Sequence, residues 1–191
     1  MIEITDQEIE RIAALCGELE DGKAVRNVLR RALNRAFGHA QTMAVKHITK
    51  TYNIKKYELL GATKIGKKTF DMTQDDLEAS FEYAGNVIPL ARFSLSAMNT
   101  IRGKNKESVK ASIKKESGYK TLHHAFAAYM KYGYGIFERR TRARGSIEQL
   151  YGPSAAHMLD NPIVQDDIDT SAQTMFDKRL DIEMEYLLNN F

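Results

Sequence analysis

The sequence is poor in the residues that cross-link small proteins or carry chains through membranes. Its 191 residues include one cysteine, three prolines and no tryptophan. A single thiol cannot form an intramolecular disulfide, so we expect Cys16 to be a small buried side chain in a reducing compartment. No run of about 18 apolar residues occurs, so we expect no membrane-spanning helix and no membrane partner. The acidic N-terminus lacks the apolar segment of a signal peptide.

Motifs for metal binding, phosphate binding and nucleophilic catalysis are also missing. The sequence has no cysteine pair, no His-x-x-x-His spacing, no P-loop and no Gly-x-Ser-x-Gly elbow. His123 and His124 are adjacent, so on a strand they would point to opposite faces and could not hold one metal ion. The acids of the last predicted helix are typical of a solvated face. The sequence therefore predicts no catalytic residues, no cofactor and no metal site, and it argues against an enzyme such as a metal-dependent nuclease.

Charge, by contrast, is plentiful and is distributed in blocks. Charged residues make up 28% of the chain and apolar residues 43%, as in ordinary globular proteins, and the length suits one domain. The net charge is +3, but residues 1–22, 71–91 and 145–191 carry −6, −5 and −7, whereas residues 23–70 and 92–144 carry +11 and +10. Such blocks give a surface oppositely charged faces, which suit docking to other copies or to an anionic partner. The alternative is that the blocks neutralise one another within one subunit.

Helices are predicted at both ends of the chain. The segments are 6–19, 23–52, 153–160 and 162–189. The first begins with a capping box from Thr5 to Glu8, and Pro153 suits the first turn of the third. The second and the last keep apolar residues at helical spacing, and Asp166 lies in the first turns of the last, where the helix dipole favours negative charge.

Between the helices, apolar residues alternate with polar ones, which is typical of half-buried strands. Leu77 to Tyr83 alternates in this way, and after a turn at 84–86 the segment Val87–Phe93 returns as its predicted partner. Pro89 has no amide donor, so this strand should lie at an edge or carry a bulge. Further strands are predicted around 108–114, 125–130 and 136–140. The sequence thus predicts a single α+β domain over residues 1–191, with N-terminal helices, a central antiparallel β meander of about four or five strands within about 76–140, and a long C-terminal helix.

A cluster of basic residues is the main candidate binding feature. It comprises Arg139, Arg140, Arg142 and Arg144, with Lys104 and Lys106 on the preceding loop. On an exposed turn these side chains could face an acidic protein surface, or they could neutralise phosphates without reading base sequence. No zinc finger, RNP motif or helix-turn-helix accompanies them. Tyr132, Tyr134 and Phe137 could stack on bases, or they could belong to the core of the sheet.

A sharp corner follows the basic cluster and is the second candidate. Its residues are Ile147, Leu150, Tyr151, Gly152, Pro153 and Ser154. We expect a structural role for this corner. Either Gly152 adopts a positive φ that other residues avoid, or it lets Tyr151 pack beneath the chain.

The order of these features resembles the phage lambda minor tail protein Z family over nearly the whole chain. Four blocks carry the resemblance, namely the N-terminal helix pair with Arg31–Ala36, then Ile88–Phe93, then His124–Met130 followed by Gly133–Arg140, and finally Ser146–Ser154 with the late helix around Arg179–Leu180. The last block, with its Ile-x-x-Leu-Tyr-Gly-Pro-Ser run, is the most specific. The chain departs from the family at Ala155–Met158, where a proline-containing continuation would be expected.

The resemblance implies a non-enzymatic tail completion protein of a phage or prophage, present in the host cytoplasm during assembly and then in the tail of the virion. Such a protein would act late in tail assembly at the head-proximal end, near the path of the DNA. Its implied partners are other tail or neck proteins and further copies of itself in a small ring. The alternative from a different class is a basic module that binds nucleic acid nonspecifically, for which the arginine cluster is the argument.

The C-terminal helix suggests how copies could meet. We expect it to pack its apolar stripe on the meander and to offer its acidic side to a basic surface of a neighbouring copy, within residues 102–120. Contacts between exposed charges are weak singly and are screened by salt. The sequence therefore predicts self-association that weakens as salt is added.

Overall fold

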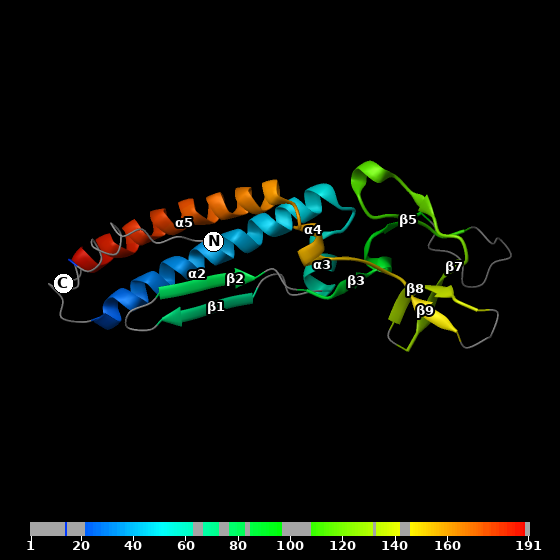
Figure 1. The fold of residues 1–191 in the computed structure, drawn as a ribbon, viewed down its shortest axis with the longest axis horizontal. Coiled ribbons are helices and arrows are strands. Elements are labelled where there is room, and N and C mark those ends of the chain that lie inside the picture. The colour runs from blue at the N-terminus through cyan, green and yellow to red at the C-terminus, as the bar shows by residue number, and fades with distance from the viewer. Residues whose placement is uncertain are drawn as a thin grey trace. The chain divides into compact units, whose positions relative to one another are not determined.

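The structure, a computed structural model, describes residues 14, 22–62, 67–72, 77–82, 85–96, 108–131, 133–141 and 146–189 (Figure 1). The chain divides into two compact units. One comprises residues 1–44, 66–83 and 160–191, and the other comprises residues 45–65 and 84–159. Apart from Ala14, the helix predicted at 6–19 lies outside the described residues. The single-domain organisation stays a prediction.

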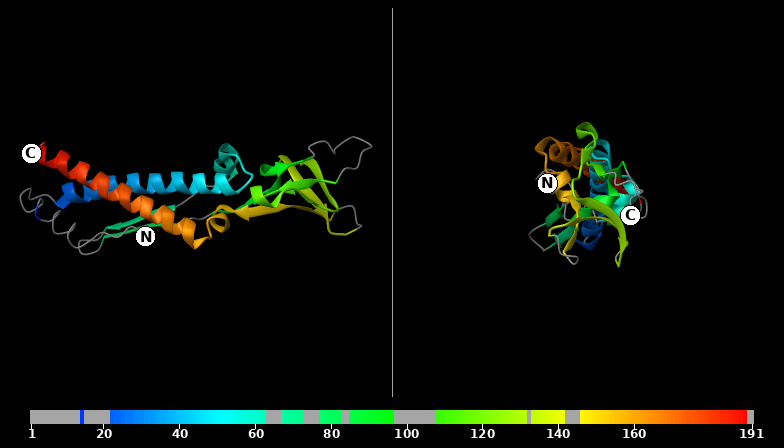
Figure 2. Two further views of the ribbon diagram at one scale, coloured as in Figure 1. Left: turned by 90° about the horizontal axis from the view of Figure 1, so that it is seen from above. Right: turned by 90° about the vertical axis from the view of Figure 1, so that its right-hand side faces the viewer.

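Two long helices dominate the first unit. They are α2 (Gly22–Thr51), which contributes its residues up to Ala44 to this unit, and α5 (Pro162–Asn189). Both agree with the helices predicted at 23–52 and 162–189. Figure 1 and Figure 2 show them side by side, and they run antiparallel, since His39 Nε2 is hydrogen-bonded to Ser171 Oγ at 2.8 Å and Arg31 Nε lies 3.2 Å from Glu183 Oε2.

The core of the first unit is built from residues four apart on both helices. The buried positions are Val28, Leu29, Ala32, Leu33, Ala36, Phe37, Ala40 and Ala44 on α2 and Ile168, Ala172, Phe176, Leu180 and Met184 on α5. Side chains four residues apart lie on one face of a helix, so each helix has one continuous apolar stripe. Leu33 and Phe176 are fully buried, and each such side chain stabilises the fold by roughly 1.5–3 kcal/mol. The sequence predicted that α5 packs on the meander, but its partner in this unit is α2.

The described residues of the first unit also include two strands. They are β1 (Lys67–Met72) and β2 (Leu77–Glu82), which pair antiparallel from Lys67 opposite Glu82 to Met72 opposite Leu77. The strand predicted from Leu77 onward is therefore present. Its predicted partner is wrong, because β2 pairs with the strand before it and not with Val87–Phe93. The period-2 pattern identifies a strand but carries no information about which neighbour it meets.

The second unit contains most of the strands and two short helices. Its elements are α3 (Lys56–Ala62), β3 (Val87–Pro89), the 3-10 turn η1 (Leu90–Arg92), β4 (Ser94–Leu95), β5 (Lys110–Ser112), the 3-10 turn η2 (Lys115–Ser117), β6 (Lys120–Thr121), β7 (Ala125–Met130), β8 (Gly133–Arg139), β9 (Ile147–Gln149), β10 (Tyr151–Ser154) and α4 (Ala155–Met158). They form the antiparallel sheets β10-β3, β4-β5-β6 and β7-β8-β9. The buried residues here include Ile88, Phe93, Val109 and Ile136.

The structure confirms the α+β class, with antiparallel strands between helices and a long C-terminal helix. In the part of the chain that the structure describes, the strands are distributed over four small sheets, of which two are three-stranded meanders, in place of one continuous meander. The pairing of β3 with β10 joins strands far apart in the sequence, and local turn signals could not predict it. Pro89 lies in a two-stranded sheet whose register shifts between Tyr151 and Ser154, as expected for an edge strand with an irregularity.

Two local predictions are wrong. Pro153 belongs to β10 and not to the first turn of a helix, and the helix predicted at 153–160 is confined to α4. Ser154 is its N-cap, where Oγ accepts a hydrogen bond from the amide of His157 at 3.2 Å. His123 and His124 form the turn before β7, with His124 at φ 68°, and do not stand on a strand.

Candidate functional site

The predicted basic cluster lies at the end of β8. Arg139 is the last residue of this strand and Arg140 follows it, and both side chains are exposed. Arg142 and Arg144, together with Lys104 and Lys106, lie outside the described residues. The two residues that flank this turn are hydrogen-bonded to each other, because the amide of Arg140 donates to the carbonyl of Ser146 at 3.1 Å.

A carboxylate that the sequence analysis missed accompanies Arg140. Arg140 forms an ion pair with Glu148, and Glu148 stands opposite Glu138 in the β8–β9 register. Two like charges directly opposite each other repel, so the guanidinium next to them offsets this repulsion. Glu148 was missed because its proximity depends on the pairing of β8 with β9. The sequence signal for this contact was an acidic residue, Glu148, in the strand segment that follows the basic turn.

Arg139 lies against aromatic residues. Its guanidinium carbon is 5.7 Å from the centroid of the Phe126 ring, which lies 6.2 Å from the ring of Phe137. Phe137 is buried at 8% exposure, so it belongs to the core, which was one of the two interpretations of these aromatics. The Arg139 guanidinium therefore lies within cation–π distance of the Phe126 ring.

Replacing both Arg139 and Arg140 by serine is expected to leave the melting temperature nearly unchanged. The Arg140 and Glu148 side chains are 73% and 50% exposed, and exposed pairs contribute about 0–1 kcal/mol. Thermal unfolding followed by circular dichroism measures the change, with Lys56→Ser on α3 as a control at another exposed cation. A fall of more than about 8 °C would show that the two arginines are structural.

The corner from Ile147 to Ser154 connects three parts of the second unit. The amide of Leu150 donates to the carbonyl of Ile136 at 2.8 Å, and the carbonyl of Leu150 accepts from the amide of Leu90 at 3.0 Å. Leu150 therefore ties β8 to the start of η1, and Ser154 caps α4 at the other end of β10. The corner joins two sheets and a helix.

Gly152 is required by a close contact and not by its backbone angles. Its φ is not positive, and Tyr151 is 50% exposed, so neither of the two predicted explanations is correct. A Cβ atom at Gly152 would lie 2.5 Å from Cε2 of Phe93, a side chain that is 5% exposed. The buried ring of Phe93 occupies the space that any larger residue would need.

Tyr129 and Tyr134 form a cross-strand pair on the β7–β8 hairpin, with ring centroids 5.2 Å apart. Tyr129 is 76% exposed, whereas the hydroxyl of Tyr134 is buried and has no hydrogen-bond partner among the described residues. Burial, and secondarily the nearby Tyr129, raises the pKa of Tyr134 above its ordinary value. The neutral phenol is thus favoured in the folded state.

We expect Tyr134→Phe to raise the free energy of unfolding by about 1 kcal/mol, because it removes a buried hydroxyl without a partner. Because the pKa of Tyr134 is higher in the folded chain than in the unfolded one, its neutral phenol makes its full contribution to stability below the unfolded pKa of about 10. This contribution is lost as the pH rises through the folded pKa. The variant should therefore lose less stability than the wild type in that alkaline range. Urea unfolding below and above pH ~10 tests this. Tyr119→Phe is the control, since its hydroxyl is hydrogen-bonded to Ser94 at 2.8 Å, and equal losses in the two variants would contradict the prediction.

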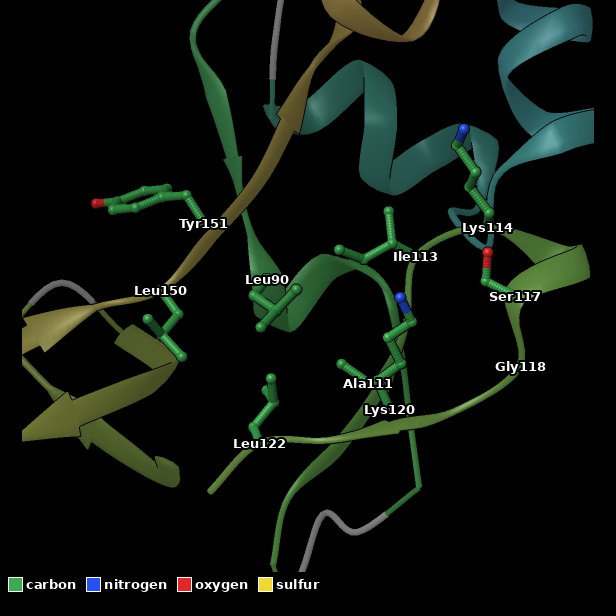
Figure 3. Close-up of a pocket in the computed structure, with 10 residues that line it drawn as sticks. All are labelled: Leu90, Ala111, Ile113, Lys114, Ser117, Gly118, Lys120, Leu122, Leu150 and Tyr151. Carbon is green, nitrogen blue, oxygen red and sulfur yellow. The ribbon is translucent and has the colours of Figure 1, made fainter. Parts of the chain in front are cut away.

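A groove of about 530 Å³ lies within the second unit (Figure 3). Its lining is Leu90, Ala111, Ile113, Lys114, Ser117, Gly118, Lys120, Leu122, Leu150 and Tyr151. Figure 3 shows Leu90, Leu122 and Leu150 around the same space. Lys114 and Lys120 are exposed. The groove is thus mainly apolar, with Lys114 and Lys120 at its exposed edge, and the ammonium of Lys114 lies 5.9 Å from the centroid of the Tyr52 ring.

Three further findings bear on function. Among the described residues, no three His, Cys, Asp or Glu side chains gather as a metal site would require. No helix in the described part of the chain is long and apolar enough to cross a membrane. Comparisons with protein-family models, curated proteins and solved structures find no significant match to this chain.

Proposed function

We propose that this chain is a non-enzymatic structural protein of a phage or prophage tail. It completes the tail at the head-proximal end and acts as one copy within a small ring. The observation that carries the proposal is the ordered set of sequence blocks, above all Ser146–Ser154. The structural role expected of that block fits its hydrogen bonds, because Leu150 joins β8 to η1 and Ser154 caps α4.

The surface of both units also supports a protein that works by docking. Large apolar side chains are exposed on several described elements, among them Tyr129 at 76% and Ile163 at 80%. Exposed apolar side chains that gather in a patch mark surfaces that bind other proteins, and these side chains are accessible for such contacts. The alternating charge blocks fit the same use, since a head-to-tail contact places one patch against a different patch of the neighbour and closes into a ring when the rotation between copies permits it.

The alternative, nonspecific nucleic-acid binding, has weaker support. Glu148 and Glu138 lie beside Arg140, and carboxylates at this position oppose the approach of phosphates. Arg139 remains available for a phosphate or for an acidic protein surface. Electrophoretic mobility of DNA with the purified chain at about 50 mM and 200 mM salt separates the two, because phosphate contacts weaken steeply with salt.

Deletion of the gene from the phage or prophage that encodes the chain tests the proposal. We expect the induced lysate to contain filled heads and separate tails, and a plasmid copy should restore joined particles. The Arg139→Ser/Arg140→Ser copy should restore fewer of them although it is folded. Joined, infectious particles at an unchanged titre after deletion would contradict a role in tail completion.

A further inference from the structure

The groove of the second unit has the properties of a protein-docking site. Sites for small molecules place a few polar groups inside an apolar pocket to orient the ligand. In this groove the polar side chains, Lys114, Ser117 and Lys120, are all exposed, and the inner lining is apolar. A groove with an apolar floor and lysines at its exposed edge favours a partner segment in which an aliphatic side chain has carboxylates near it in the sequence.

A segment of that chemistry is present on the surface of the same chain. Ile163 is 80% exposed, which makes it the most exposed large apolar side chain in the part of the chain that the structure describes. Asp160 and Asp166 lie three residues before and after it, and both are exposed. Asp166 lies one turn after Ile163 on the same side of α5, whereas Asp160 lies two residues before the helix begins, so one carboxylate precedes and one follows the aliphatic group.

The position of Ile163 is fixed by the backbone. It lies in the first turn of α5, where its amide donates to Oδ1 of Asn161 at 3.1 Å. The carbonyl of Asn161 also accepts from the amide of Gln165 at 3.0 Å. This cap stabilises the backbone of the first turn, so docking of Ile163 has to order its side chain and not the turn that carries it.

We propose that Ile163 of one copy docks into the groove of a second copy, with Asp160 and Asp166 facing Lys114 and Lys120. The two surfaces differ, so the contact is head-to-tail and leaves a free groove at one end and a free Ile163 at the other. Such a contact builds chains or closes into a ring. This contact identifies the two surfaces that would join neighbouring copies in the ring of the proposed function. It rests on that function only because it expects copies to assemble.

The experiment is sedimentation velocity of the full chain from about 10 μM to about 1 mM, a range that detects weak association. Ile163→Ser should weaken self-association at least about tenfold, the effect of removing a central anchor. Lys114→Glu/Lys120→Glu should weaken it similarly. The matched controls are Ile182→Ser, at an exposed isoleucine on the same helix, and Lys55→Glu/Lys56→Glu, at exposed lysines beside α3. Circular dichroism of each variant checks that it is folded.

Mixing the two variants gives the sharper result. Each alone should associate at least about tenfold more weakly than the wild type, but the Ile163→Ser chain keeps its groove and the double lysine variant keeps its Ile163. An equimolar mixture should therefore form dimers that do not grow further. The dissociation constant of the wild type should rise with salt, because carboxylates face lysines across the contact.

A wild-type chain that stays monomeric to about 1 mM, or controls that weaken association as much as the variants, would overturn the proposal. So would a mixture that stays monomeric. A dissociation constant that is constant or falls with salt would overturn the assignment of Lys114 and Lys120. None of these results depends on tails, so a failed contact can be told apart from a failed tail-completion role, which the gene deletion measures.

Discussion

Replacing Gly152 by alanine is expected to lower the free energy of unfolding of the second unit by about 1–3 kcal/mol, the usual cost of overpacking a core. The added Cβ would lie 2.5 Å from Cε2 and 2.9 Å from Cζ of Phe93. The ring has little freedom to move, since Phe93 is 5% exposed and its backbone bridges to Ile54. Gly152→Val, with two more carbons in the same space, should cost more than Gly152→Ala.

Gly61→Ala in α3 is the matched control for this substitution. Nothing lies within 4 Å of a Cβ at Gly61, so the change should be neutral or stabilising, as expected for alanine in a helix. Urea unfolding of both variants measures the difference. A double variant that adds Phe93→Leu should recover part of the loss, because it removes ring atoms from the contact. Equal stability of Gly152→Ala and Gly61→Ala would show that the contact with Phe93 has no energetic weight.

The second large effect is expected at Glu183 in the first unit. Glu183 is 7% exposed and lies 3.2 Å from Arg31 Nε and 3.3 Å from Arg179 Nη2. The Nε of Arg179 is buried and has no hydrogen-bond partner among the described residues. Glu183→Ala would leave this partly buried guanidinium without its carboxylate. Breaking buried pairs costs about 3–5 kcal/mol, and because Arg31 is half exposed we expect about 2–3 kcal/mol here.

Glu185→Ala, at an exposed acid on the same helix, is the control for Glu183→Ala. Both substitutions remove one negative charge from α5 and introduce the same residue, so the difference between them isolates the contacts with Arg31 and Arg179. Urea unfolding at neutral pH measures both. A loss of stability in Glu183→Ala no larger than that in Glu185→Ala would contradict a stabilising role for this cluster.

The long helices could be predicted closely from the sequence. The stripe from Ile168 to Met184 repeats every four residues, and it sets both the extent of α5 and the face that it buries. A pattern of this kind is local, so nothing distant in the chain is needed to interpret it. The prediction failed on what α5 packs against, because an apolar stripe does not specify its partner.

Local patterns of this kind could not predict which strands pair or why residue 152 is a glycine. The partner of β2 is β1, a strand whose residues, Lys67–Met72, include two lysines and an aspartate and showed no clear alternation. At Gly152 the sequence indicated that a side chain is excluded, but the cause is Phe93, which is distant in the chain. Positive φ and close approach are alternative reasons for a glycine, and only the fold distinguishes them.

The candidate site was predicted in part. Arg139 and Arg140 are exposed at the end of a strand, as expected, but Glu148 changes the charge of their surroundings. The groove and Ile163 were not singled out, because a groove lined from three strands, two 3-10 turns and the loops beside them leaves no mark in the sequence. An isoleucine between two aspartates at the start of a helix was the available signal for the exposed aliphatic group.

Immunogold labelling of tails from the phage or prophage that encodes this chain is the most direct measurement of the proposed function. An antibody against the chain, or an epitope tag fused to it, locates the protein in negatively stained particles. We predict label at one end of free tails and at the head–tail junction of complete particles. Label along the whole tail tube, or tails and particles without label, would contradict a tail completion role at the head-proximal end.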